Sequence, residues 1–211
     1  MKILHLDSSI NHEFSVTRQL SAEVVNALMH NGEAHQVIYR DLVKDPISHL
    51  TLDIASGFRP VPGGVAASPS TVSEHELSNL LVSEFLASEV VVIGAPMYNF
   101  SVSGQLKAWM DRIAQPGKTF SYTPSGPVGH AGGKAVIIVS ARGGFYAGTP
   151  LEDMDNQERL LRKYFGFLGV TTIGCVRAEG ASKSEEVKRE EISRARSSIP
   201  AVIKAVTHSE E

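Results

Sequence analysis

Short apolar segments alternate with amphipathic segments along most of this chain, and the alternation limits the possible folds more than any other feature. The apolar segments lack strict apolar–polar alternation, which is typical of strands buried on both faces of a parallel sheet. We therefore predict an α/β fold with a doubly wound parallel sheet, because successive parallel strands need right-handed crossover helices. The expected strands are 2–6, 35–39 (the weakest), 90–95, 134–140 and 171–176, and the expected helices are 16–30 (closed by Gly32), 73–87, 103–114, 154–168 and 184–208.

One helix boundary and two insertions are readable in the pattern. Ser73 and Glu76 have the spacing of a capping box at the start of the second expected helix. Segments 57–70 and 119–133 are rich in Gly, Pro and Ser and interrupt the alternation. We interpret both as excursions beside a ligand within a single domain of residues 1–211, because a chain of 211 residues leaves little room for a second compact domain.

The composition disfavours several classes of partner. With 42% hydrophobic and 20% charged residues the chain can bury a full core, and 20 Lys and Arg against 23 Asp and Glu give a net charge of −3. This balance offers no attraction for nucleic acid or for an anionic membrane. No apolar run approaches the ~20 residues that span a bilayer, and residues 1–7 lack a signal-peptide profile. The eight His residues lack zinc-motif spacing, and the single Cys175 fits a reducing compartment, so we expect a cytoplasmic protein without a metal site.

The first loop after a strand, DSSINHEFSVT (7–17), has the residues of a phosphate site. Ligands of open parallel sheets bind beyond the carboxyl ends of the strands. Ser9, Ser15 and Thr17 lie just before and within the start of a helix, whose free N–H groups and positive dipole end favour an anion. Hydroxyl residues where a dinucleotide site has glycines favour a monophosphate. The alternative is that Ser15 only caps the helix.

The loop after the third expected strand, GAPMYNFSVSGQLKAWMDR (94–112), suits a flat aromatic ligand. Pro96, Tyr98 and Phe100 could pack against its ring, while the Asn99 amide and backbone N–H groups could meet its polar edge. The alternative is a connection whose aromatic residues only fill the core.

The loop after the fourth expected strand, SARGGFYAG (140–148), contains a pair of glycines. Gly143 and Gly144 allow the backbone to approach a ligand where a Cβ atom would clash. Arg142 could balance the charge of an anionic ligand, or it could be an ordinary surface cation.

Several other chemistries are disfavoured because their motifs are missing. Segment VGHAGGKA (128–135) lacks the first Gly and the last Ser or Thr of a GxxxxGK[ST] phosphate loop, no GxGxxG follows the first expected strand, and no GxSxG occurs. Cys175 lies in an apolar run and is better explained as a small core residue than as a nucleophile. Nucleotide hydrolysis, a tightly held nicotinamide and a serine nucleophile are therefore not expected.

Taken together, SSI with SVT, then PMYNFSVSGQLKAWMD, TFSYTPSGPVG and SARGG, resemble the FMN-dependent NADH azoreductase family, a flavodoxin-like group of NAD(P)H:quinone oxidoreductases. The resemblance runs over nearly the whole chain, and PMYNF followed by the helix with QLK is its most specific part. It implies a five-stranded flavodoxin-like parallel sheet with helices on both faces, FMN as cofactor and a homodimer. It also implies a ping-pong reaction, in which hydride passes from NADH or NADPH to the flavin and two electrons then pass to a quinone or an aromatic azo compound.

The motifs that match the family imply a set of site residues, with no catalytic side chain because the flavin carries the chemistry. Ala141 departs from the pattern, since some members have Ser there. Phe120 and Tyr122 match the aromatic lining of the substrate cleft, and Phe167 would reach it from the partner chain. The cofactor-binding residues implied are Ser9, Ser15, Val16, Thr17, Met97, Tyr98, Asn99, Phe100, Ala141, Arg142, Gly143 and Gly144.

A flavodoxin-type electron carrier, which presents FMN to protein partners one electron at a time, is the alternative function. Such carriers are commonly strongly acidic, so a net charge of −3 and two long insertions favour the enzyme. The preference for NADH or NADPH and the physiological acceptor stay open.

Overall fold

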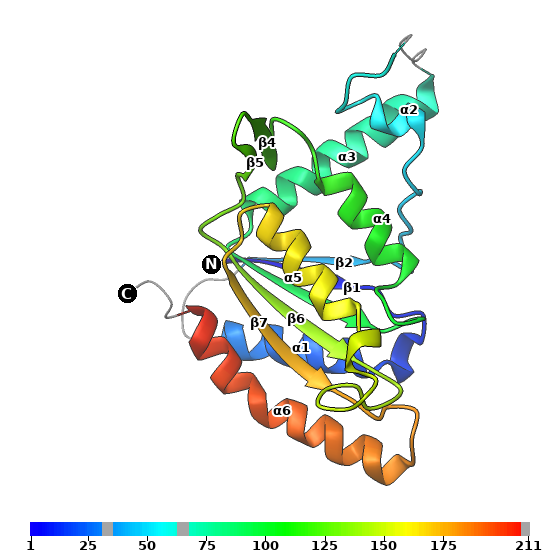
Figure 1. Cartoon of the computed structure of the whole chain (residues 1–211), viewed down its shortest axis with the longest axis vertical. Helices are drawn as coiled ribbons and strands as arrows, with labels where there is room; N and C mark the ends of the chain where they lie inside the picture. The colour runs from blue at the N-terminus through cyan, green and yellow to red at the C-terminus, as the bar shows by residue number, and fades with distance from the viewer. Residues whose placement is uncertain (31–35, 63–67, 208–211) are drawn as a thin grey trace.

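The computed structural model describes residues 1–30, 36–62 and 68–207 and contains a five-stranded parallel sheet (Figure 1). The strand order is β2-β1-β3-β6-β7, which confirms the flavodoxin-like α/β fold. Three expected boundary residues lie outside the described residues. They are Gly32 after the first expected helix, residue 35 at the start of the second expected strand, and residue 208 at the end of the last expected helix. The strands are β1 (Lys2–Asp7), β2 (Gln36–Asp41), β3 (Val90–Pro96), β6 (Ala135–Ala141) and β7 (Thr172–Ala178).

Helices cover both faces of the sheet (Figure 1). Helices α1 (Val16–Met29) and α6 (Glu185–Thr207) lie on one face, and α3 (Pro69–Ala87), α4 (Gly104–Ile113) and α5 (Gln157–Phe167) lie on the other. Each face has its own apolar core, because β3 and β6 are buried along their whole length. Phe85, Trp109 and Phe165 pack together in one core, and Leu20 and Ile199 belong to the other.

Helix α3 begins earlier than the capping-box pattern predicts. The Ser68 side chain accepts a hydrogen bond of 3.1 Å from the N–H of Thr71, and Pro69 occupies the first helical position. Proline is favoured there because its missing N–H is not needed and its φ is already helical. The prediction that Ser73 opens the helix is therefore wrong, and its hydroxyl instead donates to the carbonyl of Pro69 inside the helix.

Segment 119–133 forms a hairpin at the amino edge of the sheet. Strands β4 (Phe120–Thr123) and β5 (Gly126–Gly129) pair antiparallel, and the N–H of Ala131 donates to the carbonyl of Leu168, shortly before β7. The hairpin approaches so closely that a Cβ atom on Gly129 would lie 2.1 Å from the backbone of Gly169. Within one chain, this segment therefore lies away from the carboxyl ends of the strands, and its place beside a ligand stays a prediction.

Three short elements complete the described chain. The 3₁₀ helices η1 (His12–Phe14) and η2 (Glu152–Met154) precede α1 and α5, and α2 (Leu52–Ala55) lies in the connection between β2 and α3. The expected helix 154–168 therefore starts at Gln157, and the expected helix 103–114 starts at Gly104, where the Ser103 side chain caps α4 by accepting 3.2 Å from the N–H of Leu106.

Candidate functional site

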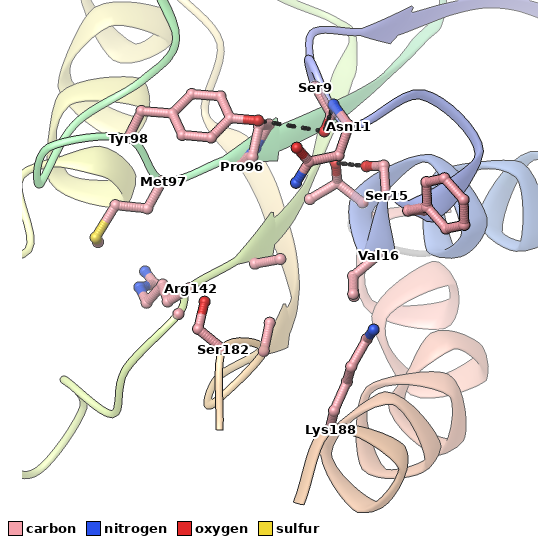
Figure 2. Close-up of a pocket in the computed structure, with 15 residues that line it drawn as sticks. Ser9, Asn11, Ser15, Val16, Pro96, Met97, Tyr98, Arg142, Ser182 and Lys188 are labelled. Atoms are coloured by element: carbon pink, nitrogen blue, oxygen red, sulfur yellow. Dashed lines mark hydrogen bonds between the residues drawn. The ribbon is translucent and has the colours of Figure 1, made fainter. Parts of the chain in front are cut away.

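A cavity of about 290 Å³ lies at the carboxyl ends of β1, β3 and β6 (Figure 2). Most of the residues expected to bind a cofactor line it, although they come from three separate loops. None of the described residues of segment 57–70 lines the cavity, and residues 63–67 lie outside the described residues. The lining residues are Ser9, Asn11, Phe14, Ser15, Val16, Thr17, Pro96, Met97, Tyr98, Ala141, Arg142, Gly143, Ala181, Ser182 and Lys188.

The turn into α1 presents unpaired donors to this cavity. Ser15 caps the helix by accepting a 3.2 Å hydrogen bond from the N–H of Arg18, and its hydroxyl also lies 3.1 Å from that of Thr17. No hydrogen bond between described residues uses the N–H of Val16 or Thr17, although both residues are buried. Buried N–H groups without partners are rare in proteins. Ser15 therefore both caps the helix and borders a place suited to an anion.

Arg18 holds the first loop in place. Its guanidinium donates to both carboxylate oxygens of Asp41, at 2.6 and 2.7 Å, and to the main-chain carbonyl of Ser9, at 3.0 and 3.3 Å. The hydrogen bonds from Arg18 hold the pKa of Asp41 at about 2, below its ordinary value. Because Asp41 compensates its charge, Arg18 positions the loop and is not a free cation for a ligand.

Tyr98 joins the second loop to the first. Its hydroxyl accepts 3.2 Å from the N–H of Ile10 and lies 3.4 Å from the hydroxyl of Ser9 (Figure 2). The loops that follow β1 and β3 are therefore tied across the cavity mouth.

Residues 98–101 form a tight turn with two non-glycine residues in the left-handed region. Tyr98 and Ser101 exchange main-chain hydrogen bonds of 2.9 and 3.1 Å, while Asn99 has φ 47° and Phe100 has φ 67°. Asparagine tolerates this conformation, but for phenylalanine it costs energy. Neither Asn99 nor Phe100 lines the cavity, and both side chains are exposed at its rim. The Phe100 ring makes an edge contact with Tyr146, at 6.4 Å between ring centres.

The side chain of Arg142 is not available to a ligand. It is buried, and its guanidinium lies 2.5 Å from Asp155, 3.0 Å from Glu158 and 3.7 Å from Glu179. The proposed role of Arg142 as a counter-charge for an anionic ligand is therefore wrong, because three carboxylates already surround it. Burial opposes ionisation of Glu158, yet the hydrogen bond from Arg177 and the charge of Arg142 hold its pKa well below the ordinary value.

The glycine pair after β6 supplies main-chain donors. The N–H of Arg142 is taken by the carbonyl of Ala178, but no hydrogen bond between described residues uses the N–H of Gly143 or Gly144. A Cβ atom on Gly143 would lie 2.7 Å from the Ser182 hydroxyl, whereas one on Gly144 would meet nothing closer than 3.4 Å. A side chain at position 143 would thus force Ser182 to shift, and Gly144 lies next to the cavity without lining it.

Comparison with known proteins now identifies the family. A family model described as a flavodoxin-like fold matches residues 1–202. An FMN-dependent NADH:quinone oxidoreductase 2 of Xanthomonas euvesicatoria pv. vesicatoria is 52% identical over 206 residues, which cover 98% of this chain and 95% of the relative. The chain belongs to the FMN-dependent NADH:quinone oxidoreductase family. Another member, from Pseudomonas aeruginosa, is 50% identical over 94% of this chain and 96% of its own length.

Solved structures agree with this family. The azoreductase from Bacillus anthracis str. Sterne superposes with a TM-score of 0.82 at 25% identity and covers 95% of this chain and 99% of its own. An FMN-dependent NADH-azoreductase from Bacillus anthracis str. Ames Ancestor, solved in complex with FMN, has a TM-score of 0.83 at 21% identity over 95% of this chain and 98% of its own, which shows the shared fold.

The loop after β7 also lines the cavity, although the sequence predicts no site residue there. Ala181, Ser182 and Lys188 line the cavity from the connection after β7 and the first turn of α6. The position of this loop could have indicated a site, since β7 also ends at this edge of the sheet. The loop has no glycine pair or aromatic cluster, however, and so no motif that predicts ligand binding. Asn11 and Phe14 lie inside the first loop and were not singled out.

The three residues expected in the substrate cleft of the oxidoreductase family lie together, but at the opposite edge of the sheet from the cavity. Phe120 is buried against Phe167, with ring centres 4.7 Å apart, and makes an edge contact with Tyr122 at 5.3 Å. They belong to the hairpin and the end of α5, at the amino edge of the sheet. The side chains of Tyr122 and Phe167 are exposed over 75% and 36% of their surface.

The structure describes residues 1–30, 36–62 and 68–207. In that part of the chain no group of three or more His, Cys, Asp or Glu side chains is placed to hold a metal ion. No helix there is long and apolar enough to cross a membrane.

Proposed function

We propose that this chain is an FMN-dependent oxidoreductase that oxidises NADH or NADPH and reduces quinones and aromatic azo compounds. One observation carries the proposal: a single cavity has unpaired main-chain donors on two sides, from Val16 and Thr17 at the α1 turn and from Gly143 at the glycine pair. A ligand with an anionic tail and a flat ring with polar edges could accept hydrogen bonds from both sets of N–H donors. FMN is such a ligand.

The phosphate of FMN is assigned to the α1 turn. The N–H groups of Val16 and Thr17 and the hydroxyls of Ser9, Ser15 and Thr17 can donate to its oxygens, and the helix dipole favours its charge. Val16 contributes only its main chain, so its apolar side chain is no obstacle.

The ring system is assigned to the loops after β3 and β6. Met97 and Tyr98 line the cavity and can pack against a flat ring, while Asn99 and Phe100 stand at the rim. The N–H groups of Gly143 and Gly144 can donate to a polar ring edge, and Ala141 lines the same side without a side-chain donor. When bound, FMN supplies the hydride and electron transfer. The protein's own residues bind it, orient it and leave one face of the site open to flat substrates.

A second copy of the chain is part of the proposal. Phe120, Tyr122 and Phe167 form an aromatic patch at the opposite edge of the sheet from the cavity, so they can border a substrate only in a neighbouring molecule. Two aromatic side chains this exposed, beside Val128 at 46%, also favour burial against a partner. We infer a homodimer in which each chain lends this patch to the other's cavity.

The cytoplasm is the proposed location. The sole cysteine, Cys175, is a free thiol, and burial, together with the charge of Glu158, raises its pKa to about 12. A protein with one unreactive thiol and a nicotinamide co-substrate suits a reducing compartment.

Steady-state kinetics test the proposed function. We expect purified protein with added FMN to oxidise NADH with benzoquinone as the sole acceptor, one NADH for each quinone, and to lose this turnover when the flavin is removed. Turnover that occurs only with a redox protein as acceptor would favour the electron carrier instead. Sedimentation should give a mass near twice 22.7 kDa, and a monomer at micromolar concentration would contradict the shared aromatic patch.

A further inference from the structure

Lys188 is a cation in the cavity that the phosphate assignment has not used. It lies in the first turn of α6, and its side chain extends toward Val16 at the start of α1 (Figure 2). The two helices pack side by side, and an ion pair between Arg196 and Glu23, at 2.7 Å, ties them together further along. Both helices therefore begin at the same edge of the sheet, and Lys188 lies between their first turns.

The charge of Lys188 has little compensation within the described chain. Its ammonium lies 3.7 Å from Glu185, which is beyond hydrogen-bond distance, and that carboxylate is 86% exposed. The other cation lining the cavity, Arg142, is enclosed by carboxylates. Of the described cavity residues, Lys188 alone thus offers an ammonium that an entering anion can pair with.

The position of Lys188 is unfavourable for α6 alone. A cation in the first turn of a helix opposes the dipole, whereas the acidic residues Glu185 and Glu186 in the same turn are favourable. An anion bound between the starts of α1 and α6 would accept hydrogen bonds from the unpaired N–H groups of α1 and would compensate the charge of Lys188.

We infer that Lys188 pairs with the phosphate of FMN and so sets the preference of the site for FMN over riboflavin. The inference rests on the proposed function. Hydroxyl and N–H donors can hold a phosphate, but a mobile ammonium adds a charge-assisted hydrogen bond and makes binding depend on the ionic form of the ligand. Riboflavin has the same ring and side chain but no phosphate, so Lys188 contributes nothing to its binding.

Titration of the flavin-free full-length chain with FMN and with riboflavin, followed by flavin fluorescence, tests the inference. We expect Lys188→Gln to lower the affinity for FMN about tenfold and to leave the affinity for riboflavin within twofold. Lys188→Arg should restore most of the FMN affinity, since it keeps the charge. Lys183→Gln is the matched control, because it removes the same charge five residues away. Lys183 is exposed and does not line the cavity.

Rising salt concentration provides a second readout. The difference in FMN affinity between the wild type and Lys188→Gln should shrink as salt screens the ion pair. Equal losses for FMN and riboflavin, an unchanged FMN affinity, or an equal loss in Lys183→Gln would each overturn the inference. A wild-type chain that binds neither flavin would instead overturn the proposed function itself, so the two failures are distinguishable.

Discussion

Arg18 and Asp41 form a two-point ion pair, with hydrogen bonds of 2.6 and 2.7 Å, and the Nη2 atom of Arg18 that donates to Asp41 also donates to the Ser9 carbonyl, at 3.0 Å. The pair lies under the first cavity loop and fixes its main chain. We expect Asp41→Asn to lower stability by ~1–3 kcal/mol and to weaken FMN binding severalfold, measured by denaturant unfolding and by flavin titration. Asp45→Asn is the control, since Asp45 is an exposed acid on the same connection, and losses of the same size in both variants would contradict a positioning role for the pair.

Acid should destabilise the protein through the same carboxylate. The pKa of Asp41 in the folded chain, about 2, is below its ordinary value of 3.8, so the folded state binds its proton less tightly than the unfolded state does. Its contribution to stability is then present above about pH 4 and is lost as the pH falls toward 2. Unfolding measured at steps from pH 5 to pH 2 should show a shallower decline for Asp41→Asn than for the wild type. Parallel curves would contradict the assignment.

The two glycines after β6 should differ in their tolerance of a side chain. An alanine Cβ at Gly143 would lie 2.7 Å from the Ser182 hydroxyl, while Gly144 has space at 3.4 Å. We expect Gly143→Ala to weaken FMN binding roughly three- to tenfold, because Ser182 or the loop must shift, and Gly144→Ala to bind nearly as the wild type does. Combining Gly143→Ala with Ser182→Gly should restore part of the affinity, and no rescue would argue against steric contact as the cause.

Replacing Phe100, whose backbone is in the left-handed region, should change flavin binding without changing the stability of the fold. Glycine adopts a φ of 67° without strain, so Phe100→Gly should leave the free energy of unfolding within about 1 kcal/mol of the wild type. If the ring packs against the flavin, affinity for FMN and for riboflavin should both fall by the same factor. Asn99→Gly changes the same turn without removing an aromatic ring, and wild-type flavin binding by Phe100→Gly would refute a contact with the ring.

The aromatic patch should affect the substrate more than the cofactor. Tyr122 is 75% exposed, so Tyr122→Ser should fold normally, keep its FMN affinity and lower kcat/KM for benzoquinone. Phe120 is buried and in contact with Phe167, so Phe120→Ala should mainly destabilise the hairpin, by ~3 kcal/mol or more. Unchanged quinone kinetics in a stable Tyr122→Ser dimer would exclude the patch from the substrate site.

The sequence predicts the sheet well because its central strands are buried on both faces and so appear as continuous apolar runs. It also predicts the α1 turn and the loops after β3 and β6, since ligand residues in this fold gather at strand ends. It fails for Arg142, because nothing in SARGG shows that Asp155 and Glu158, from another element, will enclose the guanidinium. It fails for Lys188 for the same reason, since only the packing of α6 beside α1 brings the ammonium to the cavity.

An equilibrium titration of the flavin-free chain with FMN shows whether the cavity binds this cofactor. Three loops at one edge of the sheet should bind one FMN per chain with a dissociation constant at or below the micromolar range, and the bound protein should be yellow. A colourless protein that binds no FMN at micromolar concentrations, while keeping its folded structure, would show that these loops do not form a flavin site.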